Sequence, residues 1–293
     1  MIDRRPAVIV QCAEADDVPH AISYARENGL EISIRGGGHN IAGSALCDNG
    51  MVIDFSNMTH VSVDAQNRRA YVEPGATLGD FDKAIQAHGL ATPVGINSTT
   101  GIAGLTLGGG FGWLTRQYGM TVDNLVAAKM VSANGQKLRT SEKEHSDLFW
   151  AIRGGGGNFG VVTQFEFQLH SVGPNVLAGL IVFPLDEAKV ILKKYREMVA
   201  TAPENLNVFA VLRQAPPLPF LPEDVHGKPV IILALFYNGN EEKGWKFVDS
   251  LRGFGNAHGE HVGVMPYVEW EKAFDPLLTP GARNYWKSHN FTE

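Results

Sequence analysis

The stretch Ile34-Arg35-Gly36-Gly37-Gly38-His39-Asn40 decides the fold prediction, and it follows a short strand pattern that begins at Ile32. Three consecutive glycines have no Cβ atoms, so several backbone N–H groups can close on one anion. The histidine that follows can act as a nucleophile or as a ligand. The stretch therefore predicts a loop that holds a cofactor by its pyrophosphate, with the reactive end beside His39. The alternative is a glycine-rich turn with an incidental histidine.

Two further glycine clusters lie downstream. Residues 99–113 read TTGIAGLTLGGGFGW, and residues 153–160 read RGGGGNFG. Two such loops can hold two parts of one extended cofactor, and the alternative for 99–113 is tight packing on small residues. The third cluster contains the spacing GxGxxG from Gly155 to Gly160. It is not a Rossmann fingerprint, because a helix pattern precedes it and a strand pattern follows, which reverses the Rossmann order.

Composition excludes several classes of partner. The chain has 293 residues, a net charge of −6 and 44% hydrophobic residues. It carries no basic stripe, so neither nucleic acid nor an anionic membrane is expected as a partner. No apolar run is long enough to cross a membrane, and residues 1–6 (MIDRRP) lack the apolar segment of a signal peptide. A globular, cytoplasmic protein is the expectation.

The two cysteines, Cys12 and Cys47, are expected to be free thiols, because they form neither a disulfide framework nor a metal motif. No group of histidine and acidic residues has metal-ligand spacing, so no metal is expected. Trp113 and Phe149 are expected in the core. The histidines at turns and at the ends of elements are expected to be polar surface residues: His60, His88, His145 and His170.

Periodicity and turn signals divide residues 8–169 into helices and strands. Strands are expected at 8–12, 32–34, 51–55, 61–63, 70–72, 125–132, 136–138 and 161–169. Helices are expected between 16 and 29, at 77–88 with Thr77 as the cap, and at 147–153. Asn134-Gly135 is a strong hairpin signal. The first strand, helix and second strand form a βαβ unit that leads into the loop at 36–40.

The pattern changes at residues 171–174 (SVGP), which marks a domain boundary. Beyond it, a strand at 177–183, a helix at 185–199, strands at 208–212 and 230–236, and a helix at 241–251 are expected. This order is typical of an α+β domain with an antiparallel sheet. Two domains are therefore predicted, at 1–173 and 174–293.

Together, these motifs resemble the FAD-linked oxidases of the vanillyl-alcohol oxidase superfamily, in the berberine-bridge-enzyme-like group. The resemblance rests on residues 35–39, on 101–116 continuing through 118–124, and on 147–163. Residues 281–288 (GARNYWKS) look like a substrate-domain segment of the same group. The resemblance implies an α+β fold, with a two-lobed PCMH-type FAD-binding domain at 1–173. A partial substrate-binding domain with an antiparallel sheet then follows at 174–293.

The resemblance also implies that FAD lies across the glycine clusters. The residues at the family's cofactor-binding positions are Arg35, Gly36, Gly37, Gly38, His39, Asn40, Gly43, Ser44, Thr99, Thr100, Gly101, Gly104, Leu105, Gly108, Gly109, Gly110, Gly112, Asn158, Gly160 and Val162. In the family, the histidine at the position of His39 bonds covalently to the 8α-methyl carbon of the flavin. The alternative for His39 is a non-covalent contact with FAD.

A second tether is not expected. Many relatives carry a cysteine upstream of the second glycine cluster, where this chain has Asn97 or a neighbour. No cysteine follows Cys47, so a single covalent link at His39 is predicted. In the family the double tether tends to accompany an open groove for bulky substrates, so oxidation of sugar oligomers is less expected here.

The activity that the resemblance implies is that of an FAD-dependent oxidase. Such an enzyme takes a hydride from a C–H bond next to an alcohol or amine, delivers it to flavin N5, and passes the electrons to O2 to give H2O2. The implied partners are a small organic substrate and O2. Two alternatives stay open: a catalytically incompetent flavin-binding fragment, and an FAD dehydrogenase that uses another acceptor.

The catalytic base is not identified by any motif. Tyr285 and Lys287 are candidates that would face the flavin from the substrate domain, and the alternative is that both are ordinary sheet residues. Relatives continue well beyond residue 293, so the chain is either a fragment or a natural truncation. A truncated sheet leaves an unpaired edge and exposed apolar surface. We therefore expect the chain to express poorly or to self-associate.

Overall fold

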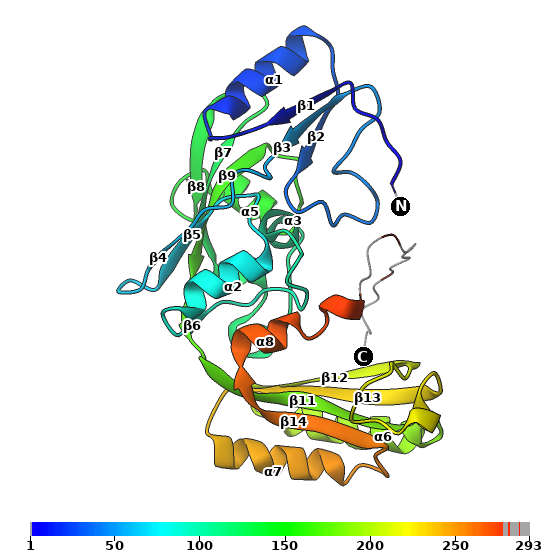
Figure 1. Cartoon of the computed structure of the whole chain (residues 1–293). Helices are drawn as coiled ribbons and strands as arrows, with labels where there is room; N and C mark the ends of the chain where they lie inside the picture. The colour runs from blue at the N-terminus through cyan, green and yellow to red at the C-terminus, as the bar shows by residue number, and fades with distance from the viewer. Residues whose placement is uncertain (1, 278–280, 282–286, 288–293) are drawn as a thin grey trace. The chain divides into compact units, whose positions relative to one another are not determined.

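The computed structural model describes residues 2–277, 281 and 287 (Figure 1). Its contacts divide the chain into two compact units. Unit 1 contains the chain up to Gly112, residues Tyr118–Ser171 and the described residues from Glu271 onward. Unit 2 contains Trp113–Gln117 and Val172–Trp270. The domain boundary expected after Gly173 stays a prediction, and the contacts place the segment 113–117 with unit 2.

A three-stranded parallel sheet in unit 1 has the order β1 (Val8–Gln11), β3 (Met51–Asp54), β2 (Ile32–Arg35). Helix α1 (Asp17–Glu27) connects β1 to β2, which confirms the predicted βαβ unit. Val18 and Ile22 on its buried face belong to one hydrophobic cluster with Ile53 of β3. Gly29 follows the helix with a φ of +64°, a conformation that few other residues adopt without strain.

A five-stranded sheet in unit 1 has the order β4 (Val61–Asp64), β5 (Arg69–Val72), β9 (Val161–Gln168), β7 (Leu125–Val131), β8 (Lys137–Ser141). All its neighbouring strands are antiparallel, and the hairpin predicted at Asn134-Gly135 joins β7 to β8. Burial alternates along β9, where Phe165 and Phe167 are buried while Gln164 and Glu166 are partly exposed. One face of this sheet therefore belongs to the core, and the other is polar.

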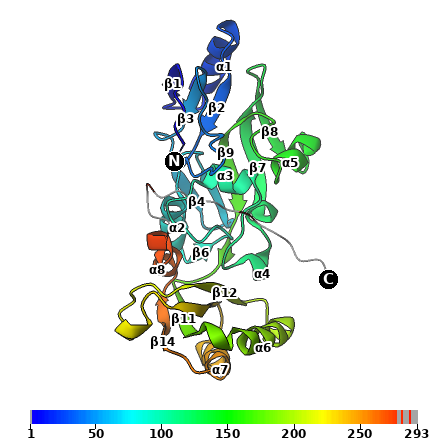
Figure 2. The ribbon, with the colours of Figure 1, turned by 90° about the vertical axis from the view of Figure 1, so that its right-hand side faces the viewer.

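Helix α2 (Leu78–Gln86) contacts the core side of this sheet. It begins with a capping box, in which Thr77 Oγ1 accepts a hydrogen bond from Asp80 N–H and Asp80 accepts one from Thr77 N–H. The Phe81 ring of the helix lies 5.5 Å from the Phe167 ring of β9, centroid to centroid. Helix α5 (Ser146–Ile152) contacts β8, and Figure 2 shows it beside β7 and β8.

Several short elements lie between the longer helices and strands. They are β6 (Leu90–Ala91), α3 (Ile102–Leu107), α4 (Thr115–Tyr118), β10 (His170–Ser171) and the 3₁₀ turns η1 (Thr121–Asn124), η2 (Leu185–Glu187), η3 (Glu223–Val225) and η4 (Asp275–Leu277). Strands β6 and β10 pair with each other antiparallel. The sequence analysis expected a helix at 185–199, which includes η2, but it identified none of the other short elements, because runs of two to six residues are too short to show a period.

Unit 2 contains a four-stranded antiparallel sheet in the order β12 (Leu206–Gln214), β13 (Pro229–Tyr237), β11 (Asn175–Pro184), β14 (Gly259–Pro266). Helices α6 (Ala188–Thr201) and α7 (Glu241–Arg252) cover one face of it (Figure 1). The predicted antiparallel α+β architecture is confirmed. The sequence analysis missed β14 and α8 (Tyr267–Lys272), since residues 259–266 (GEHVGVMP) lack a regular apolar alternation.

An aromatic cluster inside unit 2 includes Trp113, which is 2% exposed. Its ring stacks on Phe209 of β12 at 4.4 Å between centroids and lies 5.1 Å from Trp270. Asn207 Nδ2 donates a hydrogen bond to the Trp113 carbonyl at 3.1 Å. The expectation that Trp113 is a core residue is confirmed, and Phe149 in unit 1 is also buried.

Three further observations concern residues 2–277, 281 and 287. No helix among them is long and apolar enough to cross a membrane. No group of three or more histidine, cysteine or acidic side chains among them is arranged to hold a metal ion. Cys12 and Cys47 are both free and buried.

Candidate functional site

The first glycine loop starts where β2 ends, at an ion pair. Arg35 Nη1 lies 2.8 Å from Asp54 Oδ2, and Asp54 ends the neighbouring strand β3 with only 5% of its surface exposed. Asp54 Oδ1 also accepts a hydrogen bond from Ser56 N–H at 2.8 Å. The Phe55 N–H donates to the Arg35 carbonyl at 2.9 Å. The base of the loop is therefore fixed by both its backbone and its charges.

The backbone N–H groups of residues 36–40 follow one another along the first glycine loop. Within the described part of the chain, none of these consecutive N–H groups donates a hydrogen bond to a protein acceptor. The loop then closes on itself, because Gly43 N–H donates to the Asn40 carbonyl at 3.1 Å and Ser44 N–H donates to Asn40 Oδ1 at 3.2 Å. Such a run of free donors is suited to the oxygen atoms of an anion.

The second glycine cluster lies directly against the first. A Cβ atom on Gly37 would lie 2.5 Å from the backbone nitrogen of Gly101, and a Cβ atom on Gly101 would lie 2.4 Å from that of Gly37. A Cβ atom on Gly36 would lie 2.8 Å from the Pro74 carbonyl oxygen. Gly37 and Gly101 are required because a side chain on either would separate the two loops, and Gly36 is required because a side chain there would clash with the Pro74 backbone.

The third glycine cluster is attached to the second by its backbone. The Leu107 carbonyl at the end of α3 accepts hydrogen bonds from Gly154 N–H at 3.1 Å and from Gly156 N–H at 2.9 Å. Arg153 Nε donates to the Val122 carbonyl at 2.9 Å, and Arg153 Nη2 lies 3.3 Å from Asp123 Oδ1. All three glycine clusters therefore form one connected region of unit 1.

His39 is exposed at the junction of the first two loops. Its Nε2 lies 3.0 Å from Thr99 Oγ1, and its Nδ1 lies 3.5 Å from Thr100 Oγ1. Thr99 Oγ1 in turn donates a hydrogen bond to Asn97 Oδ1 at 2.6 Å. The imidazole is thus held by the second loop while it stays accessible beside the free N–H groups of the first.

The glycines of the second cluster do not share one reason for lacking a side chain. A Cβ atom on Gly110 would lie 2.3 Å from Thr121 Oγ1, and one on Gly112 would lie 1.9 Å from the Val94 carbonyl oxygen. These two are required by packing, as the alternative interpretation of the cluster proposed. Gly104 is different, because it is exposed and a Cβ atom there would meet no atom within 4 Å.

Asn158, Val162, Tyr285 and Lys287 are predicted site residues outside the first two glycine clusters. Asn158 Nδ2 donates to the Gly155 carbonyl at 2.9 Å, and Val162 is buried in β9. Of the two candidate catalytic residues, Tyr285 lies outside the described residues, and Lys287 is exposed. The structure therefore brings together the predicted residues of the glycine loops and adds no support for a base at 285 or 287.

His170 corrects one expectation, since it is not a simple surface residue. Its ring is partly buried and stacks on Tyr118 at 3.8 Å between centroids with an interplanar angle of 13°. Its Nε2 lies 2.6 Å from Asn124 Oδ1. Burial lowers the pKa of His170, and the nearby positive charge of Arg68 lowers it further. Nothing in the local sequence signals this stacking, because Tyr118 is distant in sequence.

Asp82 is a buried acid that the sequence analysis missed. It lies on the core side of α2 and is 2% exposed. Among the described residues, neither of its carboxylate oxygens has a hydrogen-bond partner. Burial raises the pKa of Asp82 to about 8, because a charged carboxylate is costly away from water. Its place in a helix that otherwise follows an amphipathic pattern offers no signal of this environment.

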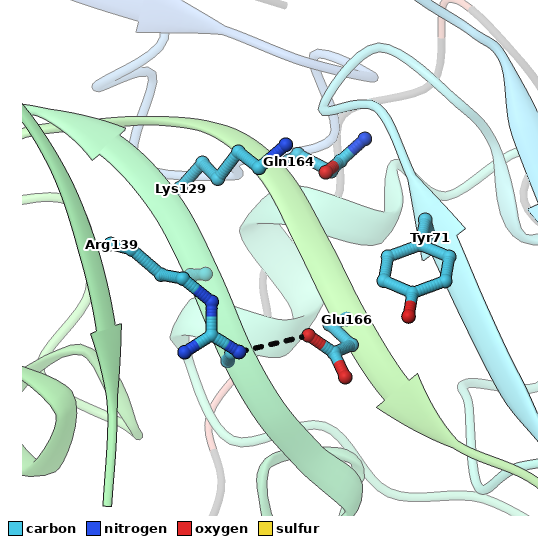
Figure 3. A pocket seen from close by; sticks show the side chains of 7 residues that line it. Tyr71, Lys129, Arg139, Gln164 and Glu166 are labelled. Atoms are coloured by element: carbon cyan, nitrogen blue, oxygen red, sulfur yellow. Dashed lines mark hydrogen bonds and ion pairs between the residues drawn. The ribbon is translucent and has the colours of Figure 1, made fainter. Parts of the chain in front are cut away.

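A separate pocket of about 410 Å³ lies on the polar face of the five-stranded sheet. Figure 3 shows the five labelled residues that line it: Tyr71, Lys129, Arg139, Gln164 and Glu166. Arg139 Nη2 lies 3.2 Å from Glu166 Oε2, and Arg69 Nε lies 3.7 Å from Glu166 Oε1. None of the predicted site residues lines this pocket, so it is distinct from the glycine loops.

Comparison with known proteins finds that the chain is similar to FAD-binding proteins. Residues 6–141 match the family described as FAD binding domain. The chain is 35% identical over 266 residues to (R)-6-hydroxynicotine oxidase of Paenarthrobacter nicotinovorans, covering 91% of this chain and 57% of that protein. It is 35% identical over 218 residues to berberine bridge enzyme-like 27 of Arabidopsis thaliana, covering 72% of this chain and 40% of that protein.

Solved structures give the same result. The crystal structure of 6-hydroxy-D-nicotine oxidase from Arthrobacter nicotinovorans superposes with a TM-score of 0.84 at 32% sequence identity. This match covers 95% of the chain and 60% of the solved one. The chain thus spans between two fifths and three fifths of the length of these similar proteins.

Proposed function

Because the chain belongs to the FAD-linked oxidoreductases that include the berberine bridge enzyme-like proteins, we propose that unit 1 binds FAD across its three glycine loops. The observation that carries this proposal is the run of N–H groups at 36–40, which donate to no acceptor in the described chain and end beside an exposed imidazole. In the proposed complex these N–H groups bind the pyrophosphate. The contact between Gly37 and Gly101 keeps both loops at one cofactor.

We further propose that His39 forms one covalent bond to the cofactor. The imidazole is exposed, and Thr99 and Thr100 of the second loop hold it in place. The position at which many relatives carry a second, cysteine tether is taken in this chain by Asn97 or a neighbour, and Asn97 is 6% exposed. Its amide has no nucleophilic sulfur, so the chain supplies a single attachment point.

The whole protein is proposed to oxidise a small organic substrate at a C–H bond next to an alcohol or amine. Bound FAD would accept the hydride and pass the electrons to O2, which yields H2O2. The residues of this chain contribute positioning: the ion pair between Arg35 and Asp54 fixes the first loop, and His39 retains the cofactor. Unit 2, with its antiparallel sheet, is the proposed location of substrate binding.

The mass of the denatured protein, made with ample FAD, tests the attachment. We expect a gain of one FAD on the peptide that contains residue 39, and we expect His39→Ala to lose this mass gain while it keeps some FAD non-covalently. An unmodified mass in the parent chain would contradict the covalent link. H2O2 yield per substrate oxidised tests the acceptor, because a dehydrogenase that uses another acceptor would produce none.

A further inference from the structure

We propose that Asp275 is a positioning residue for the cofactor site, because it holds the turn at 97–100 whose threonines contact His39. This inference rests on the FAD binding proposed above, and it adds a residue that none of the glycine clusters contains. Asp275 lies in η4 and is separated from Ser98 of the turn by 177 positions in the chain. Both residues nevertheless belong to unit 1.

Both carboxylate oxygens of Asp275 contact Ser98. Oδ1 accepts a hydrogen bond from the Ser98 backbone N–H at 2.8 Å, and Oδ2 accepts one from the Ser98 hydroxyl at 2.5 Å. Hydrogen bonds to an ionised carboxylate are stronger than those between neutral groups. Both residues are partly buried, so water competes for these bonds less than it does at an open surface. The carboxylate therefore fixes the backbone and the side chain of Ser98 together.

The carbonyl groups of the same turn are held by the first residues of α2. Gly79 N–H donates a hydrogen bond to the Ser98 carbonyl at 2.9 Å, and Leu78 N–H donates one to the Thr100 carbonyl at 2.8 Å. The first N–H groups of a helix have no acceptor inside the helix, so the turn supplies their partners. Ser98 is thus held by α2 through its carbonyl and by Asp275 through its N–H and its hydroxyl.

The two residues that follow Ser98 contact the imidazole. Thr99 Oγ1 lies 3.0 Å and Thr100 Oγ1 lies 3.5 Å from the nearer ring nitrogen of His39. These contacts depend on the backbone position of the turn. With alanine at position 275, the Ser98 N–H and hydroxyl lose these acceptors, and only the carbonyl side of the turn stays attached to α2. Asp275 therefore acts on His39 through the turn.

The first experiment measures the turn without FAD, by hydrogen exchange of residues 97–101 in the full chain, read by mass spectrometry. In Asp275→Ala we expect the Ser98 amide hydrogen to exchange at least about tenfold faster, the effect of one lost hydrogen bond to a charged group. Asp275→Asn should stay within about threefold of the parent chain, because its amide oxygen still accepts from the Ser98 N–H and its NH₂ group can donate to the hydroxyl oxygen.

The matched control is Asp64→Ala. Asp64 at the end of β4 also accepts hydrogen bonds from the backbone N–H and the side chain of one residue, Asn67, at 3.0 and 2.7 Å. Its loss should leave exchange at 97–101 as it is in the parent chain.

The second readout is the rate at which the full chain gains the mass of FAD. Asp275→Ala should slow this gain about tenfold, and Asp275→Asn should restore it to within about threefold of the parent rate. Ser98→Ala removes only the hydroxyl bond, so it should slow the gain about threefold. Urea unfolding shows which variants stay folded, and Ser98→Ala carries the test if Asp275→Ala does not fold.

Three results would overturn the inference: unchanged exchange at 97–101 in Asp275→Ala, attachment of FAD at the parent rate in this variant when it is folded, or no rescue by Asp275→Asn. Failure of the covalent link is distinct, because it shows in the parent chain as an unmodified mass. Flavin absorbance after gel filtration then replaces mass as the readout for the same variants. A parent chain that retains no flavin at all would contradict both proposals.

Discussion

Gly37 and Gly101 lie backbone to backbone, since a Cβ atom on Gly37 would come within 2.5 Å of the Gly101 nitrogen. We expect Gly37→Ala to force the two loops apart. Overpacking of this kind costs about 1–3 kcal/mol of unfolding free energy, and the displaced loop should also lose most of its FAD. Urea unfolding and flavin absorbance after gel filtration measure the two effects. The control is Gly263→Ala in β14, where a Cβ atom meets nothing within 4 Å.

Gly104→Ala should separate the two effects, because it should weaken FAD binding without lowering stability. A Cβ atom there meets no protein atom within 4 Å, and alanine favours a helix by about 1 kcal/mol over glycine. Gly104→Ala should therefore unfold at the same or a higher urea concentration. If FAD covers this surface, the methyl group should still weaken flavin retention by about tenfold, equivalent to 1.4 kcal/mol. Retention as strong as in Gly263→Ala would place the cofactor elsewhere.

Asp82 should make the stability of unit 1 depend on pH. Its pKa is raised from 3.8 to about 8 in the folded chain, so between these values the folded state binds more protons than the unfolded state. The unfolding free energy should therefore fall as the pH rises from about 4 to about 8, by at most about 1.4 kcal/mol per pH unit. Asp82→Asn, which resembles the neutral acid, should flatten this slope.

The measurement is urea unfolding at several pH values between 5 and 8. A matched change at an exposed acid, Glu223→Gln in η3, should leave the slope as it is in the parent chain. Equal slopes for Asp82→Asn and the parent chain would show that Asp82 gains a partner that offsets its burial.

Strand β14 should promote self-association. It lies at the edge of the four-stranded sheet as described, and Val264 on it is 44% exposed. Exposed apolar edges pair with other chains, and a charged residue blocks this pairing. Light scattering over a concentration series should show larger species for the parent chain and fewer for Val264→Lys. Val190→Lys on α6, where the valine is 56% exposed, is the matched control and should change little.

Local signals predicted much of the fold. The capping residue Thr77, the Asn134-Gly135 turn and the alternation along β9 each act over a few residues, so the sequence displays them. The glycine loops were also predicted, because three clusters in one order are visible without a structure. The antiparallel sheet of unit 2 followed from the order of its elements.

Contacts between distant residues were not predictable in the same way. The stacking of Tyr118 on His170 and the burial of Asp82 depend on which elements pack together. The orientation of Asn97 toward Thr99 depends on a turn whose geometry no motif specifies. Strand β14 was missed because its sequence, GEHVGVMP, has no regular apolar alternation.

The segment Trp113–Gln117 has a consequence for how these two units can be separated. It belongs to unit 2 although residues of unit 1 flank it on both sides. No single cut of the chain, and no single recombination crossover between relatives, can exchange one unit intact. A hybrid joined at residue 171 would place Trp113 from one parent opposite Phe209 from the other. Exchange of the second unit between relatives therefore requires that Trp113 and Phe209 be exchanged together.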